Sequence, residues 1–268
     1  MFSSPHSGDF YPSELLERTD LDDLALRSSE DAFVNQLFRA APSYGAPLLA
    51  ARYPRAFVDL NRASNELDPA LIAGAPKSNR SPRINAGLGV IPRVVSDSRA
   101  IQSGKMTLSD AQERIDTYYT PYHETLHGLL RETRDRFGYA ILFDCHSMPH
   151  DALAGSTMVN GARPEIVLGD RFGASCERWV MDAATELFDA AGFRVVRNAP
   201  FAGGFITQSY GKPSAGIHAL QIEIDRSLYM DEVSITKCAK FGTVQRQIGD
   251  IVRQLAAIGE RTTRIAAE

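Results

Sequence analysis

Four short polar segments carry the side chains in this chain that could do chemistry. Each follows a run of residues typical of a β-strand, and together they supply two histidines, several carboxylates and two arginines. The segments are residues 5–9, 59–62, 144–147 and 223–226. Ligands of an open α/β sheet bind where the strands end at their carboxyl edge, so we expect these segments to meet there. Their residue types suit a catalytic zinc ion, which takes three protein ligands and keeps one position open for water.

A different metal-binding pattern lies in residues 123–127, which read His-Glu-Thr-Leu-His. On a helix, His-Glu-x-x-His is the signature of the zincin metalloproteases. The predicted helix here buries apolar side chains between Tyr122 and Leu130, which turns both histidines toward its flank. The surrounding alternation of strands and helices also differs from that of a zincin. We therefore interpret His123 and His127 as solvated or rim histidines.

The four polar segments, together with residues 87–93 and the pair Gly203-Gly204, resemble the N-formylglutamate amidohydrolases, which are relatives of the zinc carboxypeptidases and aspartoacylase. The resemblance spans nearly the whole chain and depends on the order and spacing of all these segments. It implies a zinc-dependent amidohydrolase that acts on a small N-acyl amino acid. Such proteins usually carry a full strand before the first turn, whereas here only residues 1–4 precede it, so we expect a truncated or misassigned start.

The resemblance implies that His6 and His146 bind the zinc ion and that Asp144 orients His146. It leaves two candidates for the third ligand. Asp9 lies three residues after His6, the spacing at which the carboxypeptidases place His and Glu. Asp31 opens a predicted helix in a segment that the family shares. Either acid could instead be an exposed carboxylate that caps a turn or a helix, so the sequence leaves the third ligand open.

The resemblance also implies roles for a glutamate and several arginines. Glu223 acts as the general base, which takes a proton from the attacking water and passes it to the leaving amine. Asn61 and Arg62 clamp the carboxylate of the substrate, which a guanidinium group can bind through two hydrogen bonds. Arg55 polarises the scissile carbonyl. Two further arginines are candidates for a second substrate carboxylate, namely Arg93 and Arg226.

The spacing of apolar residues predicts the elements that position these side chains. Strands are predicted at residues 2–4, 56–60, 139–143, 166–168, 193–196 and 218–225. Helices are predicted at residues 33–38, 121–137, about 170–192 and 241–258. This order predicts an α/β fold in one domain over residues 1–268, with a mixed, mostly parallel sheet flanked by helices, and the resemblance makes that fold zinc carboxypeptidase-like. Residues 63–108 show little periodicity and are expected to form a long connection with ordered turns, of the kind that often contributes to a site.

Alternation along the last predicted strand orients Glu223. Leu220, Ile222 and Ile224 occupy one face of this strand, and Glu223 therefore points to the other. The predicted base thus faces away from the apolar side chains of its own strand.

Composition and charge exclude several other classes of protein. Lys and Arg number 29 against 33 Asp and Glu, a formal net charge of −4 without blocks of like charge, so neither nucleic acid nor a membrane surface is an expected partner. No apolar run approaches the roughly 20 residues that cross a bilayer. Three cysteines without paired spacing and no recognisable leader segment predict a reduced, cytoplasmic protein. The expected partner is a small N-acyl amino acid, and the oligomeric state stays open.

The sequence thus predicts hydrolysis of N-formyl-L-glutamate, or a close N-acyl amino acid, to formate and the free amino acid, a reaction of histidine degradation. One zinc ion is the expected cofactor, and another divalent metal would also suit the ligands. Two alternatives remain: another amide hydrolase on the same scaffold, such as a peptidase or a deacylase, or a non-catalytic protein that binds an acidic metabolite. The presence of His6, His146 and Glu223 argues against the non-catalytic alternative.

Overall fold

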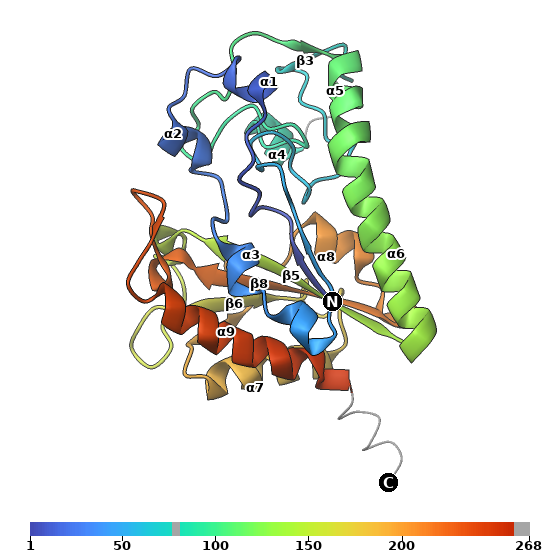
Figure 1. The fold of residues 1–268 in the computed structure, drawn as a ribbon, viewed down its shortest axis with the longest axis vertical. Helices are drawn as coiled ribbons and strands as arrows, with labels where there is room; N and C mark the ends of the chain where they lie inside the picture. Colours follow the sequence, from blue (N-terminus) through green and yellow to red (C-terminus); the bar gives the residue numbers. More distant parts are fainter. Residues whose placement is uncertain (77–80, 260–268) are drawn as a thin grey trace.

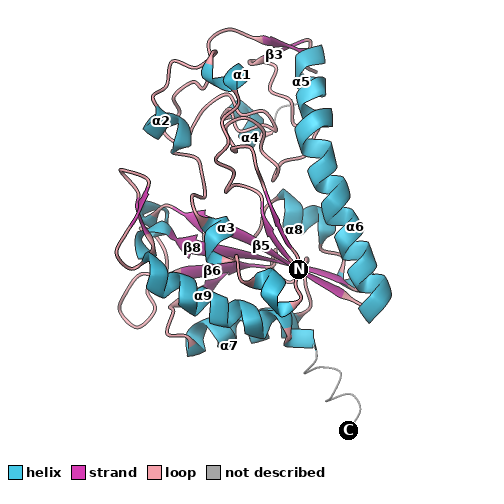
Figure 2. Ribbon diagram, viewed as in Figure 1, coloured by secondary structure: helices cyan, strands magenta, loops and turns pink. Residues whose placement is uncertain are grey.

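The computed structural model describes residues 1–76 and 81–259 of the chain. A central β-sheet carries helices on both faces, and a group of short helices and loops stands over the sheet (Figures 1 and 2). Within the described ranges, no helix is both long enough and apolar enough to cross a membrane.

Six strands form the central sheet in the order β2, β1, β5, β8, β6 and β7. In the same order, their bounds are Leu48–Ala50, Phe2–Ser4, Ala140–Met148, Ile217–Asp225, Ile166–Gly169 and Val195–Arg197. The first four strands are parallel to one another, whereas β6 is antiparallel to β8 and parallel to β7. The prediction of a mixed, mostly parallel sheet is therefore confirmed.

The two longest strands, β5 and β8, pair with each other in the middle of the sheet. Every residue of β5 is buried, and so is every residue of β8 after Ile217. Strands that are covered on both faces need apolar side chains on both sides, which explains the continuous apolar run at the start of β5. Toward their carboxyl ends both strands become polar, with Asp144 and His146 on β5 and Glu223 and Asp225 on β8. The site lies at this end of the sheet.

Helices cover the two faces of the sheet and bury separate groups of apolar side chains. The helices on one face are α3 (Val34–Leu37), α7 (Arg178–Ala190) and α9 (Phe241–Ala256). The helices on the other face are α6 (Thr120–Phe137) and α8 (Phe205–Tyr210). Consecutive residues of a strand point to opposite faces, so Phe143 of β5 packs with the first group and Leu142 with the second.

Short elements build the part of the molecule that stands over the sheet (Figure 1). These elements are α1 (Ser13–Leu16), α2 (Asp23–Arg27), β3 (Ile72–Ala73), α4 (Pro82–Asn85), β4 (Met106–Thr107) and α5 (Leu108–Arg114). A π-helical turn, Ile115–Tyr119, joins α5 to α6. The described residues between 63 and 108 form only short elements and turns, in line with the predicted long connection.

The remaining elements are short and lie in connections. They are the 3-10 helices Ala41–Tyr44, His150–Leu153, Pro213–Ala215 and Arg226–Leu228, and the hairpin of β9 (Met230–Asp231) and β10 (Thr236–Lys237).

The prediction of a strand at residues 56–60 is wrong. These residues form turns, because the backbone N–H groups of Phe57 and Val58 both donate to the carbonyl oxygen of Pro54. The apolar side chains that resembled a strand are nevertheless buried, and Phe57 and Val58 pack in the group under α6.

The predicted helix from about residue 170 begins later than expected, at Arg178. Arg171, Phe172 and Gly173 have φ angles of 55°, 58° and 85°. Positive φ is incompatible with a right-handed helix, so these residues form a turn that precedes α7.

Candidate active site

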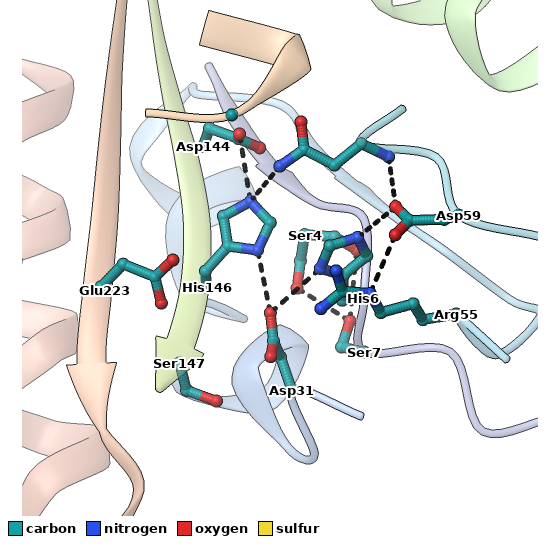
Figure 3. Close-up of polar contacts among 12 residues, drawn as sticks. Ser4, His6, Ser7, Asp31, Arg55, Asp59, Asp144, His146, Ser147 and Glu223 are labelled. Carbon is teal, nitrogen blue, oxygen red and sulfur yellow. Dashed lines mark hydrogen bonds and ion pairs between the residues drawn. The ribbon is translucent and has the colours of Figure 1, made fainter. Parts of the chain in front are cut away.

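Three buried side chains from separate parts of the chain meet at the polar end of the sheet (Figure 3). His6 lies in the turn after β1, His146 near the end of β5, and Asp31 shortly before α3. Asp31 Oδ2 lies 2.8 Å from His146 Nδ1 and 3.4 Å from His6 Nδ1. One ligand atom from each residue lies within 4.8 Å of those of the other two. Two imidazoles and one carboxylate at this spacing can hold a divalent metal ion.

The far side of each imidazole ring faces a second carboxylate. His6 Nε2 lies 2.7 Å from Asp59 Oδ1, and His146 Nε2 lies 3.1 Å from Asp144 Oδ2. A carboxylate at one ring nitrogen orients the ring and leaves the other nitrogen to bind a metal. Both rings accordingly present Nδ1 toward Asp31. The expected contact of Asp144 with His146 is present, and Asp59 stands in the same relation to His6.

The charges in this cluster depend on one another. Burial raises the pKa of Asp31, but hydrogen bonds and charges from His146 and His6 outweigh burial and hold this pKa well below its usual range. Burial lowers the pKa of His146, but Asp144 and Asp31 outweigh it and raise this pKa well above its usual value. Without a metal, Asp31 is therefore ionised and His146 is protonated. The positive charge of His146 then lies where a metal cation would bind. This donor set and its charge fit a divalent metal.

Of the two acids that the sequence left open as third ligand, only Asp31 reaches the histidines. The side chain of Asp9 is exposed, and Asp9 does not belong to the buried cluster. The preceding residue, Gly8, packs closely on Tyr53, where a Cβ would lie 2.0 Å from the carbonyl oxygen of Tyr53. The chain therefore leaves the site immediately after the turn that carries His6.

Glu223 lies beside the cluster on the neighbouring strand. Its register partner across β5 and β8 is His146, so both side chains leave the sheet on the same side (Figure 3). Burial raises the pKa of Glu223 to about 7, an effect that His146 and Arg226 oppose and Asp31 reinforces. Gln221 Nε2 donates a hydrogen bond of 2.9 Å to Glu223 Oε1. A buried carboxylate with a pKa near neutrality suits a general base.

The cluster and Glu223 line a cavity of about 490 Å³. Four arginines also line it, namely Arg55, Arg62, Arg83 and Arg226. Cavities of this size accommodate small molecules, and guanidinium groups on the wall favour an anionic one.

Two of these arginines approach Asp59, the carboxylate behind His6. Arg55 Nε donates to Asp59 Oδ2 over 2.9 Å, and Arg62 Nε lies 3.8 Å from the same oxygen. Arg62 is held further by the carbonyl oxygens of Leu88 and Asn61, at 3.0 and 2.8 Å. Asn61 also lines the cavity. The structure thus brings the predicted residues Arg55, Asn61 and Arg62 to one wall.

The two arginines expected at a second substrate carboxylate lie in different places. Arg226 lines the cavity, and its Nη2 donates to Asp31 Oδ1 over 3.0 Å. Arg93 does not line the cavity: its Nε donates to Asp68 Oδ2 over 2.8 Å, and this ion pair directs its side chain elsewhere. In this structure Arg93 therefore stands apart from the other predicted arginines, outside the wall of the cavity.

Three residues of the site have no role predicted from the sequence. Asp59 appeared only as part of a polar segment. Gln221 accepts a hydrogen bond of 2.7 Å from the Gly204 N–H and donates to Glu223, and strand alternation could have revealed it, since it lies two residues before Glu223 on the same face. Arg83 lies in the long connection, where no periodic pattern identifies a face.

Within the described part of the chain, the two histidines of the His-Glu-x-x-His motif do not come together as potential metal ligands. His127 is exposed and His123 is half-buried, and neither belongs to the group of potential metal ligands found among the described residues. His123 instead contacts the Leu60 carbonyl oxygen and the Tyr210 hydroxyl, at 2.9 and 2.8 Å. This arrangement supports the interpretation of the motif as one that does not bind metal.

Comparison with known proteins gives consistent matches. The family model for N-formylglutamate amidohydrolase matches residues 1–230. An N-formylglutamate deformylase from Pseudomonas putida is 31% identical over 239 residues, which cover 87% of this chain and 82% of that protein. An N-formylglutamate deformylase from Pseudomonas aeruginosa is 33% identical over 244 residues, with the same coverage of 87% and 82%.

Solved structures agree with the sequence matches. The crystal structure of N-formylglutamate amidohydrolase from Ralstonia eutropha JMP134 superposes with a TM-score of 0.89 at 33% identity, covering 97% of this chain and 94% of that one. A gene product of Agrobacterium tumefaciens superposes with a TM-score of 0.66 at 16% identity, over 99% of this chain and 91% of that one, and shares the fold alone. The predicted zinc carboxypeptidase-like fold is confirmed by the first of these structures. The match of the family model over most of the chain, together with relatives more than 30% identical, shows that this chain belongs to the N-formylglutamate amidohydrolase family.

Proposed function

We propose that this protein is a zinc-dependent amidohydrolase that converts N-formyl-L-glutamate and water to formate and L-glutamate. The substrate is suggested by the two bacterial relatives, both N-formylglutamate deformylases. The observation that carries the proposal is the buried group of His6, Asp31 and His146 with Glu223 in register beside His146. The side chains proposed to bind the metal and the side chain proposed as base thus line the same cavity.

His6, Asp31 and His146 would hold the metal through two imidazole nitrogens and one carboxylate oxygen. A zinc ion bound there would polarise the formyl carbonyl and lower the pKa of a water molecule toward about 7. The carboxylates of Asp59 and Asp144 support this assignment, because they orient the two rings from behind, at 2.7 and 3.1 Å.

Glu223 carries out the proton transfers. Its carboxylate takes a proton from the attacking water as the new C–O bond forms at the formyl carbon. The resulting carboxyl group then gives this proton to the nitrogen of the leaving amine as the C–N bond breaks. Because burial raises the pKa of Glu223 to about 7, both protonation states are accessible near neutral pH.

The arginines of the cavity bind the substrate and stabilise charge. Arg62 uses Nε and Nη1 on backbone carbonyls, so its remaining nitrogen, Nη2, can meet the substrate's α-carboxylate next to Asn61. Arg55 would stabilise the negative charge that develops on the formyl oxygen. Arg226 would meet the second carboxylate of the substrate.

Elemental analysis of the purified protein, followed by a formate-release assay, tests the proposal. We expect about one zinc ion per chain and turnover of N-formyl-L-glutamate that a chelator abolishes and added zinc restores. A panel with N-acetyl-L-glutamate and a short peptide identifies the preferred acyl group. Faster turnover of another panel member would replace the substrate in this proposal. Saturable binding of N-formyl-L-glutamate without hydrolysis by zinc-loaded protein would overturn the enzymatic function.

We further propose that the reaction serves histidine degradation in the cytoplasm and that residues 1–268 act as one domain. The location is supported by Cys145, Cys176 and Cys238, which form no disulfide. The single domain is supported by the two apolar groups, which pack on opposite faces of the same sheet.

A further inference from the structure

His123, the first histidine of the sequence motif on α6, makes two hydrogen bonds inside the molecule. Its Nε2 lies 2.9 Å from the Leu60 carbonyl oxygen, which can only accept, so Nε2 carries the proton and donates. Its Nδ1 lies 2.8 Å from the Tyr210 hydroxyl. Burial lowers the pKa of His123 to about 4, which keeps the ring neutral, so Nδ1 accepts from that hydroxyl. The tautomer is therefore determined by its two partners.

Tyr119 lies one helical turn before His123 and also contacts the segment of residues 60–62. Its hydroxyl donates to the Arg62 carbonyl oxygen over 2.8 Å, and its ring centroid lies 4.1 Å from that of His123. Tyr119 ends the π-helical turn that joins α5 to α6. Such turns place side chains in positions that a regular α-helix does not reach and are frequent at functional sites. The π-helical turn and the first turn of α6 thus donate hydrogen bonds to the carbonyl groups of Arg62 and Leu60, respectively.

The residue between these two carbonyls is Asn61, which lines the cavity. Its backbone N–H donates to Asp59 Oδ1 over 2.8 Å, and its Oδ1 accepts from the Ile206 N–H over 2.7 Å. Ile206 belongs to α8, the helix that also carries Tyr210, the partner of His123. The contacts from α6 and α8 therefore converge on residues 60–62, from which Asn61 and Arg62 extend into the site.

We propose that His123 and Tyr119 are positioning residues that set the backbone of residues 60–62 and thereby aim Asn61 and Arg62 at the substrate's carboxylate. They touch neither the substrate nor the metal and act through the carbonyl groups of Leu60 and Arg62. The role in turnover rests on the proposed function, whereas the role in holding the segment does not.

Two substitutions at His123 distinguish the effect of the Nε2 hydrogen bond from the effect of losing the ring. In His123→Gln the amide nitrogen falls near the position of Nε2 and can still donate to Leu60, whereas the shorter side chain of His123→Asn cannot reach it. With N-formyl-L-glutamate we expect His123→Asn to raise KM about tenfold with a smaller change in kcat, and His123→Gln to restore most of the loss. Tyr119→Phe removes only the hydroxyl that donates to the Arg62 carbonyl oxygen, and it should also raise KM. His127→Ala, on the exposed side of the same helix, is the matched control.

A comparison with a second substrate, the α-amide of N-formyl-L-glutamate, tests whether the effect depends on the α-carboxylate. This amide lacks the negative charge that Arg62 is proposed to bind. A positioning role predicts that His123→Asn and Tyr119→Phe lower kcat/KM more for the acid than for the amide. The ratio of kcat/KM for the acid to that for the amide should therefore fall. Zinc content should stay at the wild-type level in each variant. An equal loss for both substrates, or a loss of zinc, would overturn the proposal, because either result indicates general damage to the fold.

Amide hydrogen exchange tests the same proposal without turnover. We expect peptides that cover residues 57–66 to exchange faster in His123→Asn and Tyr119→Phe than in wild type or His127→Ala, with the rest of the sheet unchanged. Unchanged exchange in this segment in both variants would refute the positioning role. If the wild type fails to hydrolyse N-formyl-L-glutamate, the proposed function is wrong, and the exchange result still decides whether His123 and Tyr119 hold residues 60–62.

Discussion

His146 and Glu223 are direct partners in the register of β5 and β8. Neighbouring strands lie about 4.8 Å apart, and the side chains of paired residues leave the sheet on the same side. The separation between the proposed metal ligand His146 and the proposed base Glu223 is therefore set by backbone hydrogen bonds in the centre of the sheet. A site built on paired central strands holds its geometry more firmly than one built on loops.

The first prediction concerns Glu223 as the proton carrier. Glu223→Gln keeps the size of the side chain and its contact with Gln221 but removes the base. We expect normal zinc content and a KM near that of wild type, while kcat falls by about 10²–10⁴. Formate release at saturating substrate measures this loss. A kcat close to wild type would remove Glu223 from the catalytic role.

The second prediction distinguishes Asp31 from Asp9 as third metal ligand. Asp31→Asn replaces a buried carboxylate that lies within 3.4 Å of both histidines, whereas Asp9→Asn changes an exposed side chain. We expect the dissociation constant for zinc to rise at least about tenfold in Asp31→Asn and to stay unchanged in Asp9→Asn. Competition with a chromophoric chelator measures both values. The opposite order would make Asp9 the ligand.

The third prediction links zinc binding to pH. In the metal-free protein, Asp144 and Asp31 raise the pKa of His146 well above 6.5, so His146 is protonated at pH 7. Asp31, with its lowered pKa, is already ionised and contributes no proton. Zinc must displace the proton of His146, so its affinity should increase with pH, by up to about tenfold per unit for each proton released, until the raised pKa is passed.

Calorimetry in buffers of different ionisation enthalpy counts the protons released on zinc binding. Release of at least about one proton at pH 7 is expected, because His146 must lose its proton before it can bind zinc. Zinc binding without proton release, or with an affinity that does not change between pH 6 and 8, would contradict the assignment.

The fourth prediction concerns Arg62. Its nitrogen Nη2 is the atom proposed to meet the α-carboxylate already in the bound ground state, so Arg62→Ala should chiefly raise KM. Arg62→Lys should recover only part of the loss, because a point charge lacks the planar fork that Arg62 uses on Leu88, Asn61 and the substrate. Comparison of the acid with its α-amide provides the control. If KM rises by the same factor for the acid and for the amide in Arg62→Ala, Arg62 does not bind that carboxylate.

The fifth prediction compares two glycines. A Cβ at Gly204 would lie 2.4 Å from Asn61 Nδ2, whereas a Cβ at Gly128, inside α6, would meet nothing within 4 Å. Gly204→Ala should displace Asn61 and lower kcat/KM. Gly128→Ala should stabilise the fold by about 0.5–1 kcal/mol, because alanine favours a helix interior over glycine. Thermal unfolding and formate release measure both effects, and an active Gly204→Ala variant with normal KM would show that Asn61 does not need its observed position.

Local patterns in the sequence determined where the chemistry lies. Burial on both faces requires the apolar run that starts β5, and alternation turns Glu223 away from Leu220, Ile222 and Ile224, which pack in the core under α9. The polar residues at the ends of these strands were expected to meet at one edge of the sheet, and His6, His146 and Glu223 do line one cavity. These inferences need only the period of a strand and the rule that ligands of an α/β sheet bind at the carboxyl ends of its strands.

Tertiary structure alone decided which distant residues join them. Asp31 lies 115 residues from His146 and reaches it, whereas Asp9, three residues from His6, is exposed. Arg93 is drawn away by Asp68, and residues 56–60 curl into turns although their side chains are as buried as those of a strand. The physical reason is that periodicity specifies which face of an element is buried. The convergence of side chains from separate elements depends on how those elements pack, and no local pattern encodes that.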